Sequence, residues 1–446
     1  MSSEAESTTT TGRELLDSLL AGLRQTTAGT VLPAGLASTK TLRARALERV
    51  HALTLPSKNE EAWRFTNIAA LARESFQPLR TPTRLQPADI AHLCIEEAKT
   101  RLVFVDGKHA PQLSNIALEA AAVVGTLLTA SEARATAIAA HLGQHALFQD
   151  ALFPALNTAH LQDAAVLSLP RNTALQAPVH LLFISTQPGL ASHPRILLVA
   201  EAGSALTLIE DHLALHGGVY LNNPITEVVL GANAQIKHVR LQRESAQAFH
   251  MASCAVSLGA ASRYHSISIA MGARISRLDQ LVTQTGDGME CQLDGLALIG
   301  ANQLADTHSF IDHAKPHGVS RQSHKCIVGG AAHAVFNGQV MVRPGAQKTD
   351  SAQSSRNLLL TGKAVVDTQP QLEIFADDVK CTHGATVGQL DPEEVFYLQS
   401  RGLPETVARK LLTYAFGAEI IDRIPVASLK RQLEQAVMDQ TTGAQS

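Results

Sequence analysis

Residues 310–401 decide the fold, and they begin FIDHAKPHGVSRQSHKCIVGGAAHAVFNGQVMVRPGAQKTD (310–350). Short runs of apolar and β-branched residues alternate here with turns that contain Gly, Asn and Asp. Cys381 and His383 stand two residues apart near the end of the series. The pattern predicts a stack of short strands that ends in a thiol and an imidazole, two soft metal ligands that a partner could reach.

The same pattern begins at about Asp163 and is regular. Strand-like runs recur at 165–170, 178–184, 195–200, 205–210, 227–230, 236–242, 264–270, 339–343 and 372–375. The turns between them share a Gly followed by a small residue, at Gly203, Gly231, Gly259, Gly272, Gly300, Gly330 and Gly345. Their steps are close to multiples of about 14 residues, which predicts a parallel β-helix with two strands per coil. The alternative is an antiparallel sandwich with irregular loops.

Helical patterns flank this region on both sides. Residues 1–162 are expected to form a mainly helical domain, residues 163–390 the β-helix, and residues 391–446 a helical C-terminal domain. The N-terminal part has one β-like interruption at 101–111, with an Asp106-Gly107 turn, and a Pro-rich linker at 78–87. Its first helix carries one apolar face formed by Leu15, Leu16, Leu19, Leu20 and Leu23. Ser131 is the expected N-cap of a later helix.

The C-terminal domain should contain three helices. Asp391 and Pro392 form an N-cap and first-turn pair, Gly402 ends that helix, and Pro404 begins the next. The second helix carries an apolar stripe of Val407, Leu411, Leu412, Ala415 and Ile420. Such a helix can shield the last coil of a β-helix, or its stripe can bind a partner, and the sequence alone does not separate these roles.

Composition excludes several classes of function. A net charge of -3 over 446 residues gives no basic surface for nucleic acid. No apolar run approaches the roughly 20 residues that span a bilayer, and the acidic, Thr-rich start is no secretory signal. The five scattered cysteines lack any C-x-x-C, which favours a reducing, cytoplasmic location over a disulfide framework or a structural zinc site.

Cys381 and His383 are the leading candidate ligands. Residues two apart on a strand face the same side, so both side chains could approach one ion. A cluster or a zinc ion usually needs four ligands, so the others would have to come from another chain or an exogenous thiol. The alternative is a buried Cys beside a surface His. A second group comprises His308, His313, His317, His324, Cys326 and His333, but its spacing matches no ligand motif, and a hydrogen-bonded ladder is favoured.

Acidic pairs raise a rival hypothesis, a β-helix enzyme that acts on carbohydrates. Glu210-Asp211 and Asp377-Asp378 could supply paired carboxylates for acid–base catalysis. Asp377 and Asp378 would point to opposite faces of an extended strand, and the chain has one Trp, Trp63, in place of an aromatic sugar platform. The chain also lacks a G-x-x-x-x-G-K-[ST] loop, so we expect it to bind no nucleotide and any ATP-driven step to belong to another subunit.

Four blocks resemble the SufB/SufD family of iron–sulfur cluster assembly proteins: NEEAWRFTNI (59–68), HPRILLVAEAGSALTLIEDH (193–212), AVFNGQVMVRPGAQKTDSAQSSRNLLL (334–360) and PQLEIFADDVKCTHGATVGQLDPEEVFYLQSRG (370–402). The resemblance covers nearly the whole chain and is greatest to the SufD branch. It implies a right-handed parallel β-helix flanked by helical domains. It also implies a non-catalytic scaffold that pairs with a SufB-like paralogue and binds a SufC-like ABC ATPase, with a homodimer as the arrangement of the chain alone.

The resemblance also assigns residues. A transient iron–sulfur cluster is expected at the interface with SufB, with His383 as the metal ligand from this chain and Cys381 as a weaker candidate. SufB chains carry a functional cysteine upstream of this block, whereas residues 358–371 here contain none. Val407, Leu411, Leu412 and Ala415 are the expected ATPase-binding residues. We expect pairing with SufB through strands near residues 340 to 380, where the end of the β-helix leaves backbone groups unpaired.

Overall fold

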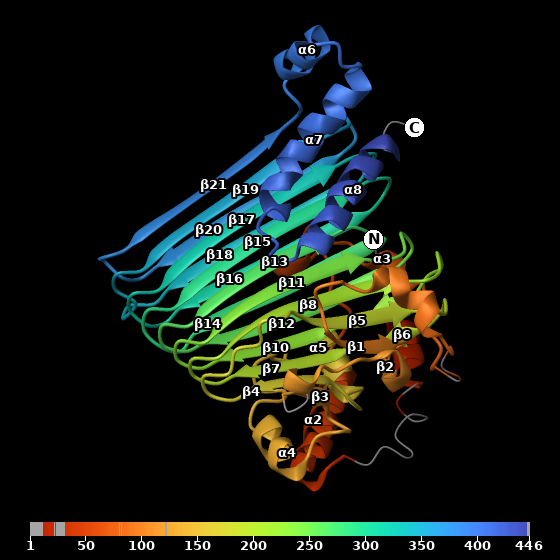
Figure 1. Cartoon of the computed structure of the whole chain (residues 1–446), viewed down its shortest axis with the longest axis vertical. Helices are drawn as coiled ribbons and strands as arrows, with labels where there is room; N and C mark the ends of the chain where they lie inside the picture. The colour runs from red at the N-terminus through yellow and green to blue at the C-terminus, as the bar shows by residue number, and fades with distance from the viewer. Residues whose placement is uncertain are drawn as a thin grey trace.

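The computed structural model describes residues 12–21, 23, 32–79, 81, 83–120 and 123–443. Most strands in these residues belong to two long sheets that face each other (Figure 1). The first sheet has the order β2 (Lys108–His109), β1 (Thr100–Val105), β5 (Val179–Ser185), β8 (Ala205–Ala214), β11 (Gln235–Arg243), β13 (Arg263–Ala270), β15 (Glu290–Ile299), β17 (Val319–Val328), β19 (Asp350–Leu359) and β21 (Lys380–Gly388).

The second sheet alternates with the first along the chain. Its order is β20 (Val365–Ile374), β18 (His333–Val342), β16 (Leu304–His313), β14 (Ile275–Gln284), β12 (Phe249–Leu258), β10 (Ile225–Leu230), β7 (Arg195–Ala200), β4 (Ala165–Leu169) and β3 (Val124–Thr126). Two short strands, β6 (Ala191–Ser192) and β9 (Leu221–Asn222), pair at its side. Because each coil contributes one strand to each sheet, the structure is a parallel β-helix with two strands per coil.

Parallel pairing in strict register builds this stack. Ile225 pairs with Ser253, and Ser253 pairs in turn with Asp279, so one coil uses about 28 residues before the chain returns to the same position. Antiparallel pairs occur at the N-terminal end, between β1 and β2 and between β3 and β4. The predicted mainly β fold, a parallel β-helix flanked by helices, is confirmed, and the sandwich alternative is wrong because the long sheets are parallel.

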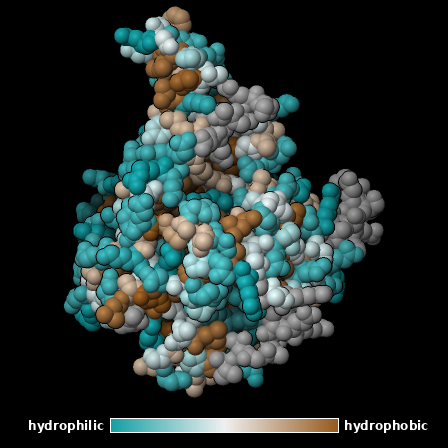
Figure 2. Space-filling model, turned by 45° about the vertical axis from the view of Figure 1, so that its right-hand side comes forward, coloured by the Kyte–Doolittle hydropathy of each residue, from teal (hydrophilic) through white to brown (hydrophobic). Residues whose placement is uncertain are grey.

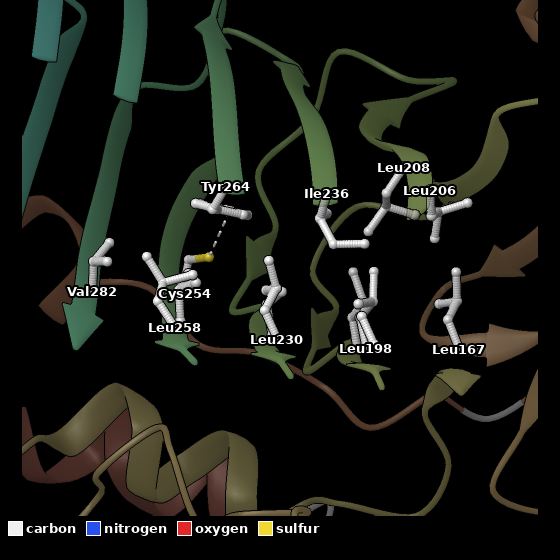
Figure 3. Close-up of a cluster of buried hydrophobic side chains, with 14 of the residues drawn as sticks. Leu167, Leu198, Leu206, Leu208, Leu230, Ile236, Cys254, Leu258, Tyr264 and Val282 are labelled. Carbon is white, nitrogen blue, oxygen red and sulfur yellow. Dashed lines mark hydrogen bonds between the residues drawn. The ribbon is translucent and has the colours of Figure 1, made fainter. Parts of the chain in front are cut away.

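The core lies between the two sheets. Figure 3 shows Leu198, Leu230 and Leu258 from the second sheet facing Leu208 and Ile236 from the first. Leu230 and Leu258 are register partners on successive coils, and Ile236 pairs in the same way with Leu206. Burying such apolar layers is the main favourable term that holds the coils together.

The recurring glycines allow the turns of neighbouring coils to stack closely. A Cβ on Gly231 would lie 2.8 Å from the backbone nitrogen of Ala202, and one on Gly259 would lie 2.7 Å from the carbonyl oxygen of Leu230. No larger side chain fits at these two corners without moving the backbone. The regular spacing of glycines such as these in the sequence therefore reflects the spacing of the turns in the β-helix.

The helices of the N-terminal region cover the outer face of the second sheet, whereas residues 87–93 and 111–113 pack against the first sheet. The region contains the helical residues 12–21 and 23, then α2 (Ser38–Ala52), α3 (Ala69–Ala72), α4 (Glu132–Ala139) and α5 (Leu152–Ala159), with short 3-10 turns η1 (Ala34–Leu36), η2 (Glu61–Trp63), η3 (Pro87–Leu93), η4 (Pro111–Leu113) and η5 (Leu118–Ala120). Leu15 and Leu19 join Leu152 in a cluster with Phe249 and Ile275 of the sheet. The three-domain division stays a prediction, since β1 and β3 of this region extend the two sheets.

Two local predictions in this region have definite outcomes. The hairpin at 101–111 is confirmed: β1 and β2 pair across Asp106 and Gly107, which have φ of 50° and 81°. Ser131 does precede α4, but its hydroxyl accepts no hydrogen bond from the first turn. Two residues of the expected linker, 80 and 82, lie outside the described residues.

The C-terminal helices are α6 (Pro392–Ser400), α7 (Glu405–Ile421) and α8 (Ala427–Gly443). Asp391 is the predicted N-cap of α6 and accepts a hydrogen bond from the Glu393 amide at 2.8 Å. Ile420, Leu429 and Leu433 pack with Val239 and Leu296 on the outer face of the first sheet. The helices therefore lie along the side of the β-helix and do not shield its last coil (Figure 1). No helix in the described part of the chain is long and apolar enough to cross a lipid bilayer.

A buried ionic network lies inside the middle coils. Glu210 accepts hydrogen bonds from Arg240 Nε at 3.0 Å and from Thr226 Oγ1 at 2.9 Å, and its oxygens lie 2.7 Å from His212 Nε2 and 3.0 Å from His238 Nε2. Burial alone would raise the pKa of this carboxyl, but these partners, Arg240 first, hold it well below its usual value. The charge is thus stable inside the protein because each of its oxygens has a partner.

Buried histidines should make the fold sensitive to acid, and His324 is the clearest case. It stacks on Phe336 with ring centroids 4.5 Å apart, and burial lowers its pKa to about 4. Below about pH 6.5 this histidine is protonated in the unfolded chain but stays neutral in the folded chain. The free energy of unfolding therefore keeps its full value above that pH and decreases as the pH falls toward 4. At pH 5 this one group should cost at most about 2 kcal/mol.

We therefore predict that His324→Leu reduces the pH dependence of stability. The free energy of unfolding, measured by urea denaturation at pH 7.5 and pH 5, should differ less in the variant than in the wild type. His51→Leu, at an exposed position of α2, should leave the difference unchanged. An equal difference in His324→Leu and wild type would show that folding does not exclude this proton.

Candidate functional site

The last coil of the β-helix is uncovered. β20 pairs only with β18, and β21 pairs only with β19, at the same end of the two sheets. Across all the residues that the structure describes, no strand pairs with the other edge of either one. These edges therefore present a row of unpaired backbone N–H and C=O groups.

Side chains that are buried in the preceding coil become exposed in this one. Ile374 is 41% exposed, whereas its register partner Val342 is 0% exposed. Val387 is 48% exposed, and its partner Asn357 is 3% exposed. The positions are equivalent, so the difference arises only because no further coil follows. Phe375, which follows Ile374, is also exposed, so apolar side chains are exposed at both ends of this last coil.

Cys381 and His383 both lie on β21. Their register partners on β19 are Ser351 and Gln353, which are buried inside the β-helix. Both candidate ligands therefore lie on the inward face of the last coil, which is the face that the next coil would have covered. The strand brings the two residues to one side, as the two-residue spacing predicts.

The two candidate ligands differ in their environments. Cys381 is half-buried and packs against the interior cluster, and burial raises the pKa of its thiol. A thiolate is the form that binds metal, so a raised pKa weakens Cys381 as a ligand. His383 is exposed, and none of the described residues forms a hydrogen bond or an ion pair with its side chain.

Within the part of the chain that the structure describes, no third ligand lies beside this pair. Among the described residues there is no group of three or more His, Cys, Asp or Glu side chains that could hold a metal ion. The second candidate group is dispersed: His308 contacts Asp306 at 2.9 Å, His313 contacts Ser320 at 2.9 Å, and His333 contacts Asp367 at 2.7 Å. Each of these histidines has its own structural partner, so the metal interpretation of that group fails.

The acidic pairs do not form a catalytic groove. Glu210 and Asp211 are buried, with Asp211 bound to Arg243 at 2.5 Å, so neither carboxylate reaches a polysaccharide. Asp378 is exposed and forms an ion pair with Lys348. The residues behind the carbohydrate alternative are thus used for internal charge balance and for a surface ion pair.

The stripe on α7 is largely exposed. Val407, Leu411 and Ala415 face solvent and Leu412 is half-buried, whereas Ile420 is fully buried against the first sheet. The prediction that Ile420 shares this stripe is wrong, because the helix rotates that position toward the sheet.

Two exposed aromatic residues beside the stripe were not among the predicted site residues. Phe396 and Tyr397 on α6 are 70% and 58% exposed, and α6 packs against α7. With aromatics at only 4% of the chain, two adjacent ones on a short helix were the available signal. We call Phe396, Tyr397, Val407 and Leu411 the C-terminal apolar surface. Figure 2 shows hydrophobic side chains gathered at this end of the molecule.

The fold and the site together define a parallel β-helical protein with a Cys and a His on the inward face of an uncovered last coil. Two family models match the chain: SufBD protein N-terminal region over residues 28–181, and SUF system FeS cluster assembly, SufBD core domain over residues 183–416. The chain therefore belongs to the SufBD family of iron–sulfur cluster assembly proteins, as the sequence motifs predict.

Individual relatives agree with this assignment. An iron–sulfur cluster assembly SufBD family protein of Synechocystis sp. is 39% identical over 411 residues, which is 90% of each chain. The iron–sulfur cluster assembly protein SufD of Escherichia coli is 31% identical over 385 residues, covering 85% of this chain and 88% of its own. The chloroplastic protein ABCI7 of Arabidopsis thaliana is 31% identical over 396 residues, covering 86% of this chain and 82% of its own.

Proposed function

We propose that this chain is a non-catalytic scaffold subunit of the SufD type, on which a nascent iron–sulfur cluster forms with ligands from two chains. The observation that carries the proposal is the place of His383: an unpartnered imidazole on the inward face of an uncovered coil. The cluster is the product of the assembly and leaves the site. His383 supplies one ligand, and a thiolate of the partner supplies another.

A SufB-like paralogue is the partner that this end of the molecule favours. A chain of the same architecture offers strand edges that continue the two sheets, and apolar side chains that cover Ile374 and Phe375 at one end of the coil and Val387 at the other. Residues 340 to 380 include β18 and β19, which already have neighbours on both sides. We therefore place the contact on β20 and β21. The chain alone would pair with a second copy through the same edges.

A SufC-like ABC ATPase is the second proposed partner. The chain has no phosphate-binding loop of its own, so an ATP-driven step must come from another subunit. The C-terminal apolar surface gives that subunit a helical docking face. The five unpaired cysteines fit a reducing location such as the cytoplasm.

Imidazole ligation suits a site that passes its cluster on. A neutral imidazole leaves the cluster less negative than a fourth thiolate would, and the histidine belongs to a chain that separates from the other ligands when the complex opens. Cys381 is the weaker ligand because its thiol is half-buried and its pKa is raised.

The first test is removal of the imidazole. His383→Ala should leave folding and complex assembly intact and reduce the cluster that accumulates on the complex, and Cys381→Ala should have a smaller effect. The measurement is reconstitution with iron and sulfide, followed by visible absorbance and activation of an apo-ferredoxin. Thr382→Ala, at the exposed neighbouring position, is the matched control. A wild-type cluster yield from His383→Ala would show that His383 is not a ligand and that this chain has only a structural role.

The second test concerns the ATPase. Leu411→Asp places a charge in the C-terminal apolar surface and should abolish co-purification of the SufC-like subunit, because the docked carboxylate would be desolvated without a partner. Thr406→Asp, also exposed on α7, should retain the ATPase. Far-UV circular dichroism checks that the β-helix is folded. Full recovery of the ATPase with Leu411→Asp would exclude this surface as its docking site.

The third test concerns the open end. Addition of the SufB-like chain should slow amide hydrogen exchange in β20 and β21, whose outer backbone groups lack partners, with little change in β16 and β17. The measurement is hydrogen–deuterium exchange with peptide resolution on the chain alone and in the complex. Unchanged exchange in both edge strands would place the interface elsewhere.

A further inference from the structure

A chain of side-chain amides runs inside the β-helix toward the open end. Gln322 on β17 donates from Nε2 to Ser309 Oγ on β16 at 2.7 Å. Gln353 on β19 donates from Nε2 to Gln322 Oε1 at 2.7 Å. Gln353 thus directs its N–H group back along the stack, whereas Gln322 directs its own across the interior to the facing sheet. Since the oxygen and nitrogen of an amide point in different directions, Gln353 Oε1 is turned away from Gln322.

The oxygen of this last amide has no partner. Gln353 is 3% exposed, and no hydrogen bond to its Oε1 exists among the described residues. A buried acceptor without a donor is costly and needs an explanation. Reversing this amide alone would set two oxygens against each other at Gln322, so its oxygen would face Gln322 only if both amides reversed together.

The backbone opposite holds this amide in place. Gly338 on β18 lies across the interior, and a Cβ at that position would stand 1.9 Å from Gln353 Nε2. Any other residue at 338 would displace the amide. Gln353 therefore occupies a space that the facing strand leaves open for it.

The next coil carries a donor residue at the same register position as Gln353. Gln353 and His383 are register partners, and side chains of paired residues on strands about 4.8 Å apart lie on the same face. The hydroxyl of Thr368 on β20 is already used, because it donates to Ser355 Oγ at 2.9 Å. Cys381 lies beside Ser351, one inward position away from Gln353. His383 is thus the donor that the register offers.

We propose that Gln353 is a positioning residue for His383. The imidazole, which as it lies here forms no hydrogen bond with the described residues, turns so that its N–H donates to Gln353 Oε1. This hydrogen bond fixes the ring and its tautomer and leaves the other ring nitrogen, unprotonated, facing the open end. Histidines that bind metals commonly donate their second ring N–H to an oxygen acceptor in this way. The role of His383 as an iron ligand rests on the proposed function, whereas the hydrogen bond concerns this chain alone. Gln353 itself touches neither iron nor sulfide.

The tautomer can be measured without any cluster. Nitrogen-15 NMR of histidine-labelled protein at pH 8.5 should show a single tautomer for His383 in the wild-type chain. Gln353→Met, of similar length and without an acceptor, should return the ring to the mixture of tautomers found in an exposed histidine. Gly338→Ala should do the same with Gln353 still present, because its Cβ displaces the amide. Gln280→Met removes an interior amide on β14 and should change nothing at His383.

Reconstitution of the complex then connects the tautomer to function. Gln353→Met should bind iron about 10- to 100-fold more weakly, the usual effect of losing such a partner. An unchanged tautomer in both Gln353→Met and Gly338→Ala would overturn the inference whatever the cluster yield. A changed tautomer with a normal yield would overturn it too, provided that His383→Ala loses the cluster. A normal yield from His383→Ala would instead overturn the proposed function.

Discussion

In-register stacking of parallel strands is the constraint on which the rest of this structure depends. A strand in the middle of the stack satisfies its backbone groups through the coils on both sides, and its inward side chains pack on the same positions of those coils. The last coil has a neighbour on one side only. The exposure of Ile374 and Val387, at positions that are buried one coil earlier, follows directly from this geometry.

Stacking also explains how charge is tolerated inside the β-helix. Residues at one inward position recur one coil apart, so Arg240 lies beside Glu210 because the two are register partners. Burial would raise the pKa of a lone Glu210, and the cations of adjacent coils reverse that shift. The amides of Gln322 and Gln353 use the same repeat to form hydrogen bonds from coil to coil. Polar residues can therefore lie in the interior where a neighbouring coil provides a hydrogen-bond or ion-pair partner.

The sequence predicts the repeating strands and turns of the β-helix, but it does not predict how the flanking helices pack on them. Glycines such as Gly231 mark the turns because a Cβ has no room there, so the period of the β-helix is visible without a structure. The side on which α7 lies depends on contacts far apart in the chain, such as Ile420 against Leu296. No local pattern encodes those contacts, and the helical period alone therefore predicts the wrong face for Ile420. The spacing of Cys381 and His383 indicated a shared face, but the open coil that exposes them is a property of the whole stack.

The uncovered last coil also gives a physical reason why Cys381 and His383 have no further ligands beside them in the described residues. A strand with a neighbour on one side can present ligands outward along the stack, but it has no further strand from which to take the remaining ligands. Within the described residues Cys381 and His383 have no third companion, so under the proposed function the other ligands belong to the chain that continues the sheet. A centre divided in this way exists only while the two edges stay paired. Separation of the edges then removes ligands and cover together, which would release a cluster without any change in the fold of this chain.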